Sequence, residues 1–206
     1  MKLKWNGHAC FTITNARGEK LIFDPFDESV GYGKLDEEAQ IACVSHHHHD
    51  HDNVKDVRNC DRVFDTAGDF SFGDYKISAC ESFHDELAGA KRGKNLIFKV
   101  TCDGETLVHM GDIGHALDDK QRAFIRNADV LLIPVGGFYT IDTPLAFKIA
   151  TASCAKCVIP MHYKNRFCDF PIETVERFAR LSNAKYLDTD EADTKALTGT
   201  VVFEKI

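Results

Sequence analysis

The chain has 206 residues, of which 44% are hydrophobic and 28% charged, and its formal net charge is -7. These values are typical of a soluble globular protein, and the length suits one domain spanning residues 1–206. The acidic charge argues against nucleic acid as a partner, because binding to phosphates favours a basic surface. The sequence contains no run of eighteen apolar residues, so no membrane partner is expected either.

The start of the chain and its cysteines indicate the cellular compartment. The first eight residues lack the apolar core of a signal peptide and favour a strand, so we expect a cytoplasmic location. The eight cysteines are then expected to be reduced thiols rather than a disulfide framework. Cys154 and Cys157 form one isolated Cys-x-x-Cys pair, and burial of most thiols as small hydrophobic groups is the simpler interpretation.

The first half of the chain is predicted to be rich in short strands. The expected strands are residues 3–14 as a bent hairpin, 21–23, 41–44, 62–66, 70–72, 75–83, 95–101 and 105–110. Asp103-Gly104 is a strong hairpin signal between the last two. Residues 26–39 form a polar, glycine-containing loop, and we expect this loop and residues 85–94 to form the rims of a functional pocket.

The second half of the chain alternates helices with strands. Helices are expected at residues 118–127, 143–153 and 172–181, and strands at 130–135, 158–161, 186–187 and 200–203. Pro171 is expected to lie near the first turn of the third helix. This order fits two sheets packed face to face with helices outside, although a three-layer sandwich accommodates the same elements.

One motif stands out directly after the strand at 41–44. His46, His48, Asp50 and His51 form the pattern His-x-His-x-Asp-His within a run of histidines. Imidazole and carboxylate are ligands that zinc and other divalent transition metals favour. In extended chain, side chains two apart point the same way, so His46 and His48 should converge on one metal. An expression tag is disfavoured, because the run is internal and interrupted by an aspartate.

Three further ligand types follow other apolar strands. His84 follows the strand at 75–83, Asp112 the strand at 105–110, and His162 the strand at 158–161. Loops at strand ends are where rigid scaffolds present functional groups. One such residue would be an ordinary satisfied polar group, but three together with the histidine motif indicate a metal site.

With these residues in place, the chain resembles the metallo-β-lactamase superfamily, in the branch of ascorbate-phosphate-lactonase-like zinc-dependent hydrolases. The resemblance extends over nearly the whole chain. It is carried by Gly7-His8-Ala9, Phe23-Asp24-Pro25, His46-x-His48-x-Asp50-His51, His84-Asp85, Arg92-Gly93-x-Asn95, Gly111-Asp112, Pro134-Val135-Gly136-Gly137-x-Tyr139-Thr140 and Pro160-Met161-His162-Tyr163.

The resemblance implies a fold and a set of metal ligands. The fold is a four-layer αββα sandwich, of α/β (α+β) class, with two mixed sheets flanked by helices and a dinuclear centre at one edge. The first metal would be bound by His46, His48 and His84, the second by Asp50, His51 and His162, with Asp112 bridging the two. The expected cofactors are two divalent metal ions, with zinc favoured and manganese or iron also suited to such sites.

The resemblance also implies a hydrolase that needs no serine or cysteine nucleophile. A metal lowers the pKa of bound water from about 15.7 toward 7, and two ions roughly 3.5–4 Å apart can share the resulting hydroxide. Asp50 and Asp112 are the catalytic candidates, with Asp50 handling the proton of the nucleophile. The expected substrate is a small ester, lactone or phosphodiester. The alternatives are a non-catalytic or regulatory metal-binding module, and a diiron redox enzyme on the same fold.

Several residues are candidates for supporting roles. Asp24 either orients the histidine loop or serves as a turn carboxylate, and His8 either supports the site or packs as an ordinary strand residue. His47 and His49 alternate away from the ligands, so we expect them to be exposed or hydrogen-bonded.

Other residues are candidates for binding substrate. Arg92 and Lys164 belong to basic clusters that follow His84 and His162, which suggests an anionic small-molecule substrate or else merely a solvated loop. Tyr139 could donate a hydrogen bond to a developing oxyanion. The sequence leaves the substrate, the native metal and the oligomeric state open.

Overall fold

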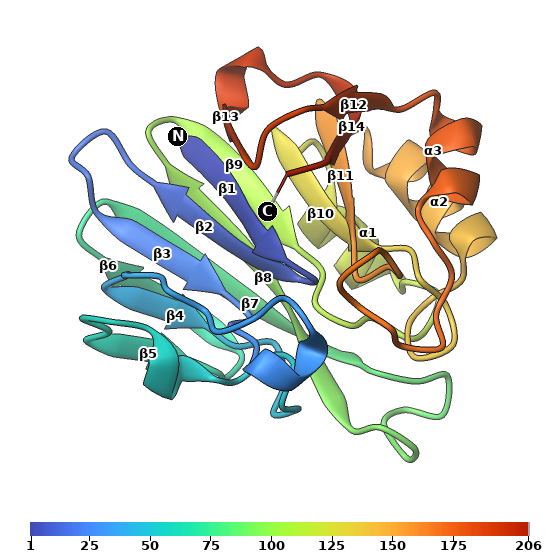
Figure 1. Cartoon of the computed structure of the whole chain (residues 1–206), viewed down its shortest axis with the longest axis horizontal. Coiled ribbons are helices and arrows are strands. Elements are labelled where there is room, and N and C mark those ends of the chain that lie inside the picture. The colour runs from blue at the N-terminus through green and yellow to red at the C-terminus, as the bar shows by residue number, and fades with distance from the viewer. Residues whose placement is uncertain (206) are drawn as a thin grey trace.

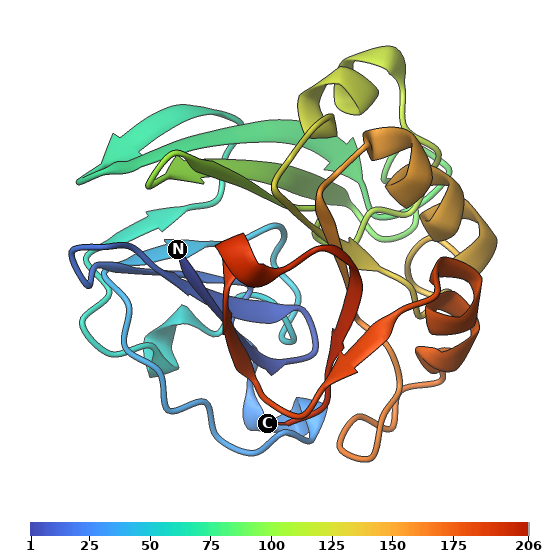
Figure 2. The ribbon, with the colours of Figure 1, turned by 90° about the horizontal axis from the view of Figure 1, so that it is seen from above.

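The computed structural model describes residues 1–205, in which two mixed β-sheets pack face to face (Figures 1 and 2). The six-stranded sheet has the order β13-β1-β2-β3-β4-β5. Its strands are β1 (Lys2–Gly7), β2 (Cys10–Thr14), β3 (Lys20–Phe23), β4 (Ile41–Cys43), β5 (Arg62–Phe64) and β13 (Glu191–Asp193). β1, β2 and β3 are antiparallel neighbours, whereas β3, β4 and β5 run parallel.

The second sheet has eight strands in the order β12-β14-β11-β10-β9-β8-β7-β6. They are β6 (Gly68–Phe72), β7 (Tyr75–Phe83), β8 (Lys94–Cys102), β9 (Glu105–His109), β10 (Val130–Pro134), β11 (Cys157–Met161), β12 (Lys185–Leu187) and β14 (Gly199–Phe203). β10 and β11 are buried along their whole length. Such continuous apolar strands are typical of parallel strands covered on both faces, and β10 indeed pairs in parallel with β9 and β11.

Three α-helices lie outside the eight-stranded sheet (Figure 2). They are α1 (Asp119–Ile125), α2 (Thr143–Ser153) and α3 (Glu176–Ser182), and three short 3-10 helices are η1 (Glu28–Val30), η2 (Val54–Asp56) and η3 (Thr194–Ala196). Asp118 and Gln121 form a capping box at α1, and Asp142 caps α2 through the Leu145 N–H group. The expected mixed fold with two sheets is therefore confirmed, although the helical layer over the six-stranded sheet is reduced to short turns.

The loop at 26–39 differs from its expected role as a pocket rim. Phe26, Val30 and Leu35 are buried and pack against Ile22 and Ala42 of the six-stranded sheet. The loop therefore replaces a helix on the outer face of that sheet, because its scattered apolar residues find a ready apolar surface there. That expectation was wrong.

Two elements near the C-terminal end also differ from the sequence prediction. The third helix begins at Glu176 rather than at residue 172, because Thr174 forms a parallel bridge with Lys164 and the Glu173 N–H group donates to Gly136 O at 2.6 Å. Strand β13 was not predicted, since its Glu-Ala-Asp sequence has no apolar pattern, and it forms by pairing with the edge of β1.

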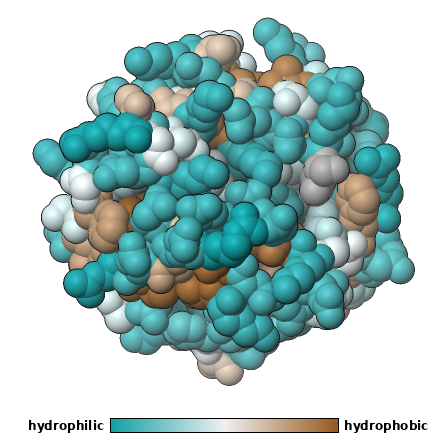
Figure 3. Space-filling model, turned by 60° about the vertical axis from the view of Figure 1, so that its left-hand side comes forward, coloured by the Kyte–Doolittle hydropathy of each residue, from teal (hydrophilic) through white to brown (hydrophobic). Residues whose placement is uncertain are grey.

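The hydrophobic core lies between the two sheets. Trp5, Phe11 and Phe23 from one sheet pack with Phe98 and Leu132 from the other in one continuous cluster. On the face drawn in Figure 3, hydrophilic residues dominate, and hydrophobic ones form small patches between them. In the part of the chain that the structure describes, no helix is both long and apolar enough to cross a membrane.

The direction of the strands sets the position of the site. β1, β3, β4, β7, β9 and β11 all finish at the same end of the sandwich (Figure 1). The segments that follow these six strands begin with His8, Asp24, Val44, His84, Met110 and His162. The topology thus brings together the strand-end side chains that the sequence singled out.

Candidate metal centre

Histidine and aspartate side chains from these strand ends form three overlapping groups that could hold a metal ion. In each group the potential ligand atoms lie within 4.8 Å of one another, and the groups are His8, Asp50, His51 and His162; His46, His48 and His84; and His46, His51 and Asp112. All seven ligand positions expected from the sequence belong to this cluster, and His8 joins them.

Asp112 stands at the centre of the cluster. Its Oδ2 atom lies 3.0 Å from His162 Nε2, 3.2 Å from His84 Nε2 and 3.3 Å from His51 Nε2. His46 Nε2 is 4.0 Å away on the same side. One carboxylate oxygen therefore faces histidines of both expected ligand sets, which is the arrangement that a bridging ligand requires.

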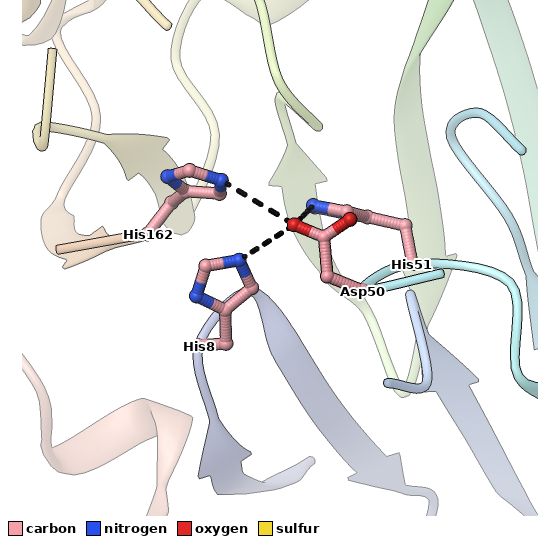
Figure 4. A group of neighbouring side chains, drawn as sticks. All are labelled: His8, Asp50, His51 and His162. Atoms are coloured by element: carbon pink, nitrogen blue, oxygen red, sulfur yellow. Dashed lines mark hydrogen bonds and ion pairs between the residues drawn. The ribbon is translucent and has the colours of Figure 1, made fainter. Parts of the chain in front are cut away.

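Asp50 faces the second set of histidines (Figure 4). Its Oδ2 atom is 3.5 Å from His51 Nε2 and 4.0 Å from His162 Nε2. His8 Nε2 donates a hydrogen bond to the same oxygen over 3.2 Å, and the His8 ring lies 4.1 Å from that of His162. His8 thus helps to orient the Asp50 carboxylate.

The other histidine group is more open. The ring of His46 lies 4.5 Å from that of His48 and 4.7 Å from that of His84, both in edge-on arrangements. His46 and His84 are buried, while His48 is partly exposed. Burial and the nearby His51 lower the pKa of His46 well below its ordinary value, so it offers a neutral imidazole.

The Asp24 carboxylate holds His51 and Ser45 in place through hydrogen bonds. Its Oδ2 atom accepts hydrogen bonds from His51 Nδ1 at 2.8 Å and from Ser45 Oγ at 2.6 Å, and its Oδ1 atom accepts from the Ser45 N–H group at 2.7 Å. In the neutral imidazole the bond to Nδ1 keeps the proton on that nitrogen, so that Nε2 carries the lone pair on the side of the cluster. Asp24 thus orients His51 rather than simply closing a turn.

The buried charges of the cluster are strongly coupled. Burial alone would raise the pKa of Asp112, but His162 and His51 outweigh it and hold this pKa well below its ordinary value. Burial likewise opposes ionisation of Asp50, and His51 outweighs it to lower the pKa. Burial would lower the pKa of His51, yet its carboxylate neighbours, Asp112 and Asp50 foremost, raise it well above the ordinary value. The carboxylates are therefore ionised, and they create a negative potential suited to cations.

Two residues that position side chains of the cluster had no role predicted from the sequence, although Asn95 belongs to the motif Arg92-Gly93-x-Asn95. Asn95 accepts the Asp112 N–H group at 2.8 Å and donates to Met110 O at 3.0 Å, which fixes the turn that presents Asp112. Ser45 approaches His46 Nδ1 at 2.9 Å through its hydroxyl. Serine and asparagine have many uses at strand ends, so only the hydrogen bonds of the folded chain reveal these roles.

The remaining histidines have ordinary structural roles. His109 Nε2 donates to Ala9 O at 2.8 Å and its Nδ1 accepts the Gly111 N–H group at 3.1 Å, so it is a satisfied core histidine. His47 and His49 have side chains 65% and 58% exposed. His47 faces Asp52 at 3.5 Å, whereas His49 Nδ1 lies 3.9 Å from Asp50 Oδ1 at the edge of the cluster. Neither histidine belongs to the groups that could hold a metal ion.

A pocket of about 360 Å³ opens onto the cluster. Arg92, Tyr139 and Phe170 line it together with His48, His49, Asp50, His84, Asp112 and His162. Lys164 is not brought to this pocket, because its Nζ atom pairs with Asp169 at 2.9 Å and the residue lines a separate groove beside Trp5. Of the candidate substrate-binding residues, Arg92 and Tyr139 reach the cluster.

The donor set fits bound metal ions. His46 Nε2, His51 Nε2 and Asp112 Oδ1 are buried atoms without a hydrogen-bond partner, and all three belong to the cluster. Buried polar atoms are nearly always satisfied, so such orphans at one place indicate an additional group. Imidazole nitrogens and carboxylate oxygens are the ligands expected of a divalent transition metal.

Comparison with known proteins agrees with the fold and the cluster, which together define a metal-dependent hydrolase of the metallo-β-lactamase type. A family model described as "Beta-lactamase superfamily domain" matches residues 2–162. A "UPF0173 metal-dependent hydrolase" of Carboxydothermus hydrogenoformans is 30% identical and aligns over 79% of this chain and 84% of that protein. The chain therefore belongs to the beta-lactamase superfamily and, within it, to the UPF0173 metal-dependent hydrolases.

Solved structures show the same relationship. A metallo-beta-lactamase superfamily protein from Thermotoga maritima, proposed to be a zinc-dependent hydrolase, is 32% identical with a TM-score of 0.81, covering 98% of this chain and 97% of that one. The short form of human tRNase Z is 13% identical with a TM-score of 0.58, covering 85% of this chain and 99% of that one. The second likeness concerns the fold alone.

Proposed function

We propose that the protein is a dinuclear metal-dependent hydrolase of a small ester, lactone or phosphodiester. The observation that carries this proposal is the position of Asp112 Oδ2, which lies between 3.0 and 4.0 Å from the Nε2 atoms of four histidines. Two of these belong to each ligand set, His46 and His84 to one, His51 and His162 to the other. A carboxylate so placed is suited to bridging two ions.

The first ion would be held by His46, His48 and His84, and the second by Asp50, His51 and His162. When bound, two divalent ions supply a water of lowered pKa as nucleophile and polarise the electrophilic atom of the substrate. Zinc is the metal we favour, because histidine nitrogen and carboxylate oxygen are its usual ligands together with cysteine, and the Thermotoga maritima relative is proposed to use it. Manganese or iron also suits such a ligand set.

Asp50 is the residue that we assign to proton transfer. It is ionised, because His51 keeps its pKa low, and it also lines the open pocket. The hydrogen bond from His8 helps to fix the orientation of its carboxylate. Proton transfer by a positioned side chain contributes about 10²–10⁴-fold to a rate.

The pocket favours a small molecule over a polymer. Its volume of about 360 Å³ is that of an ordinary small-ligand site, and Arg92 is the one cationic side chain among its lining residues. A groove for nucleic acid would instead present a row of basic side chains. We therefore propose a small-molecule substrate.

The proposal is tested by metal analysis together with hydrolysis assays. The purified protein, loaded with zinc and freed of excess by gel filtration, is expected to retain about two metal ions per chain. It is also expected to hydrolyse at least one member of a panel of nitrophenyl esters, lactones and bis-nitrophenyl phosphate. A protein that retains no zinc, or that retains it and hydrolyses none of the panel, contradicts the proposal.

A second experiment distinguishes the hydrolase from the alternative of a non-catalytic metal-binding module. Asp50→Ala should lower the rate by about 10²–10⁴-fold while the melting temperature changes little. Asp52→Ala is the matched control, because its carboxylate lies two residues on and faces His47 at 3.5 Å instead of the cluster. Equal effects of the two substitutions would favour the module.

A further inference from the structure

The loop that follows His84 is built around one buried carboxylate. Asp85 accepts four backbone N–H groups, which are those of Leu87 at 2.8 Å, Gly89 at 3.0 Å, Lys91 at 2.9 Å and Arg92 at 2.8 Å. Burial opposes ionisation, but these N–H groups lower the pKa of Asp85 to about 2. The loop at 85–93 is therefore fixed, and so is the backbone from which Arg92 projects.

Arg92 differs from the two lysines beside it in the chain. Lys91 pairs with Glu86, and Lys94 pairs with Glu81 at 3.1 Å. Within residues 1–205, no carboxylate oxygen lies within 4.0 Å of the Arg92 guanidinium. Each neighbouring cation is thus neutralised within the chain, and Arg92 is not.

The guanidinium of Arg92 rests on an aromatic wall. Its Cζ atom lies 5.6 Å from the ring centroid of Tyr139, which in turn contacts Phe170 edge-on at 6.3 Å and Phe138 at 4.8 Å. Such a contact holds the cation through its attraction to the ring face. It does not use the in-plane N–H groups, which remain available to an acceptor.

Arg92 also stands between two hollows. It lines the pocket that opens onto the metal cluster, and it lines an adjoining hollow of about 440 Å³ that includes His47, Asp65, Thr66 and Lys94. His48 is the other side chain common to both. A group bound by Arg92 would therefore lie beside the metal cluster without being a metal ligand itself.

We propose that Arg92 is a specificity-determining residue that binds an anionic group of the substrate, a carboxylate or a phosphate, separate from the bond that is cleaved. This inference rests on the proposed function, because it concerns the substrate of the same site. A fixed, unpaired guanidinium can bind such a group through two parallel hydrogen bonds. The substrate class is then a small ester, lactone or phosphodiester that carries a negatively charged group apart from the bond that is cleaved.

The test measures binding rather than turnover. Zinc-loaded protein is titrated calorimetrically with succinate, glutarate and adipate, each beside the monocarboxylate of the same length, namely butyrate, valerate and hexanoate. One carboxylate can occupy the metal cluster, so the second reports on Arg92. We expect at least one dicarboxylate to bind about tenfold or more tightly than its partner, as a charge-assisted hydrogen-bonded pair implies. A parallel titration of 3-phosphonopropionate against propionate distinguishes a phosphate from a carboxylate.

Three variants assign the preference to this side chain. Arg92→Ala should bring the two affinities within about twofold, and Arg92→Lys should retain part of the preference, because lysine keeps the charge but not the planar fork. Lys91→Ala is the matched control, since it removes the same charge from the same loop at a residue that lines neither hollow. It should leave the preference unchanged.

The outcomes separate this inference from the proposed function. A wild-type protein without the preference, an Arg92→Ala protein that keeps it, or a Lys91→Ala protein that loses it equally would overturn the role of Arg92. A protein that shows the Arg92-dependent preference but hydrolyses nothing would support the binding role of Arg92 and contradict the proposed hydrolase activity. If the protein retains no zinc, the proposed hydrolase activity is contradicted. The role of Arg92 is then tested by comparing the binding of phosphate and phosphonate to the wild-type and Arg92→Ala proteins.

Discussion

The two ends of the sandwich contain the same unusual backbone conformation but use it differently. At the metal-centre end, buried residues with left-handed φ angles include His8 at 51°, Asp24 at 43°, Gly111 at 54° and His162 at 52°. At the opposite end, exposed residues with such angles include Gly18 at 83°, Gly73 at 53°, Asp103 at 53° and Gly104 at 76°.

The opposite end follows ordinary turn chemistry. A Cβ atom added to Gly104 would meet nothing within 4 Å, whereas one added to Gly111 would lie 2.3 Å from Asn95 Oδ1 and 2.6 Å from Ser45 Cβ. A left-handed conformation costs a non-glycine residue about 1–2 kcal/mol. His8, Asp24 and His162 adopt it inside the protein, where it directs their side chains into the cluster. The comparison teaches that the left-handed conformation closes hairpins at one end, mostly at glycines that adopt it without strain, and helps to assemble a site from strained residues at the other.

The largest expected effect comes from the central carboxylate. Asp112→Asn should remove most of the bound metal and lower hydrolysis by roughly a thousandfold or more, because metal ions supply several kcal/mol of transition-state stabilisation. Asp103→Asn is the matched control, since that residue also adjoins a left-handed glycine but lies at the opposite end. Metal content and turnover of both variants are measured together, and comparable losses in the two would remove the distinction between the ends.

The next largest effect is expected on the free energy of unfolding, when Gly111 and Gly104 are each replaced by alanine. Gly111→Ala should destabilise the protein by several kcal/mol, because the left-handed penalty of about 1–2 kcal/mol is joined by the clash with Asn95 and Ser45. Gly104→Ala should cost only the first part. Urea unfolding of the metal-free proteins yields both free energies of unfolding. If the two substitutions cost the same, the tight packing behind Asp112 does not contribute to stability.

A smaller effect is expected from the carboxylate behind the histidines. Asp24→Asn should weaken zinc binding by about 10–100-fold, because groups that orient a ligand contribute that much to metal affinity. The Asp103→Asn variant should bind zinc like the wild type. Competition with a chelating dye measures both affinities, and an Asp24→Asn protein of undiminished affinity would show that His51 needs no such partner.

Proton release on zinc binding is a further property expected of the metal-centre end alone. In the metal-free chain the surrounding carboxylates raise the pKa of His51 well above its ordinary value, so it carries a proton at neutral pH. Zinc binds neutral imidazole, so binding at neutral pH must release that proton, and affinity should fall as the pH drops through neutrality and below about 6. The observed binding enthalpy at neutral pH should therefore depend on the ionisation enthalpy of the buffer. An enthalpy independent of the buffer would contradict histidine ligation by His51.

The smallest effect on zinc affinity is expected from substitution of His47, whose side chain points outward. His47→Ala should leave zinc affinity within about twofold, because its side chain is 65% exposed and contacts Asp52 and Asp65 at 3.5 and 3.7 Å rather than the cluster. The same chelator competition measures it. A loss as large as that of Asp24→Asn would mean that the run of histidines acts as a unit.

Much of this arrangement was predictable because its signals are local. Apolar strands followed by His84, Asp112 or His162 can be recognised in sequence, and the hairpin at Asp103-Gly104 needs no tertiary information. The start of the third helix was not predictable in this way, since Glu173 is held by the distant Gly136. Asn95 likewise owes its role to contacts with Met110 and Asp112, which follow the neighbouring strand β9 of the same sheet.

The loop at 26–39 shows a second limit. Its glycines and charges favoured a pocket rim, but the burial of Phe26, Val30 and Leu35 determines where the loop lies. These side chains are buried because the six-stranded sheet has an apolar outer face without an α-helix to cover it. That need is a property of the assembled sheet rather than of the loop.

The central claim is that the cluster around Asp112 holds two metal ions. Crystals of the zinc-loaded protein, measured on both sides of the zinc absorption edge, locate bound zinc directly. We predict two anomalous peaks flanking Asp112 Oδ2, roughly 3.5–4 Å apart, as in other two-metal hydrolytic sites. A single peak, or peaks away from Asp112, would contradict the dinuclear centre.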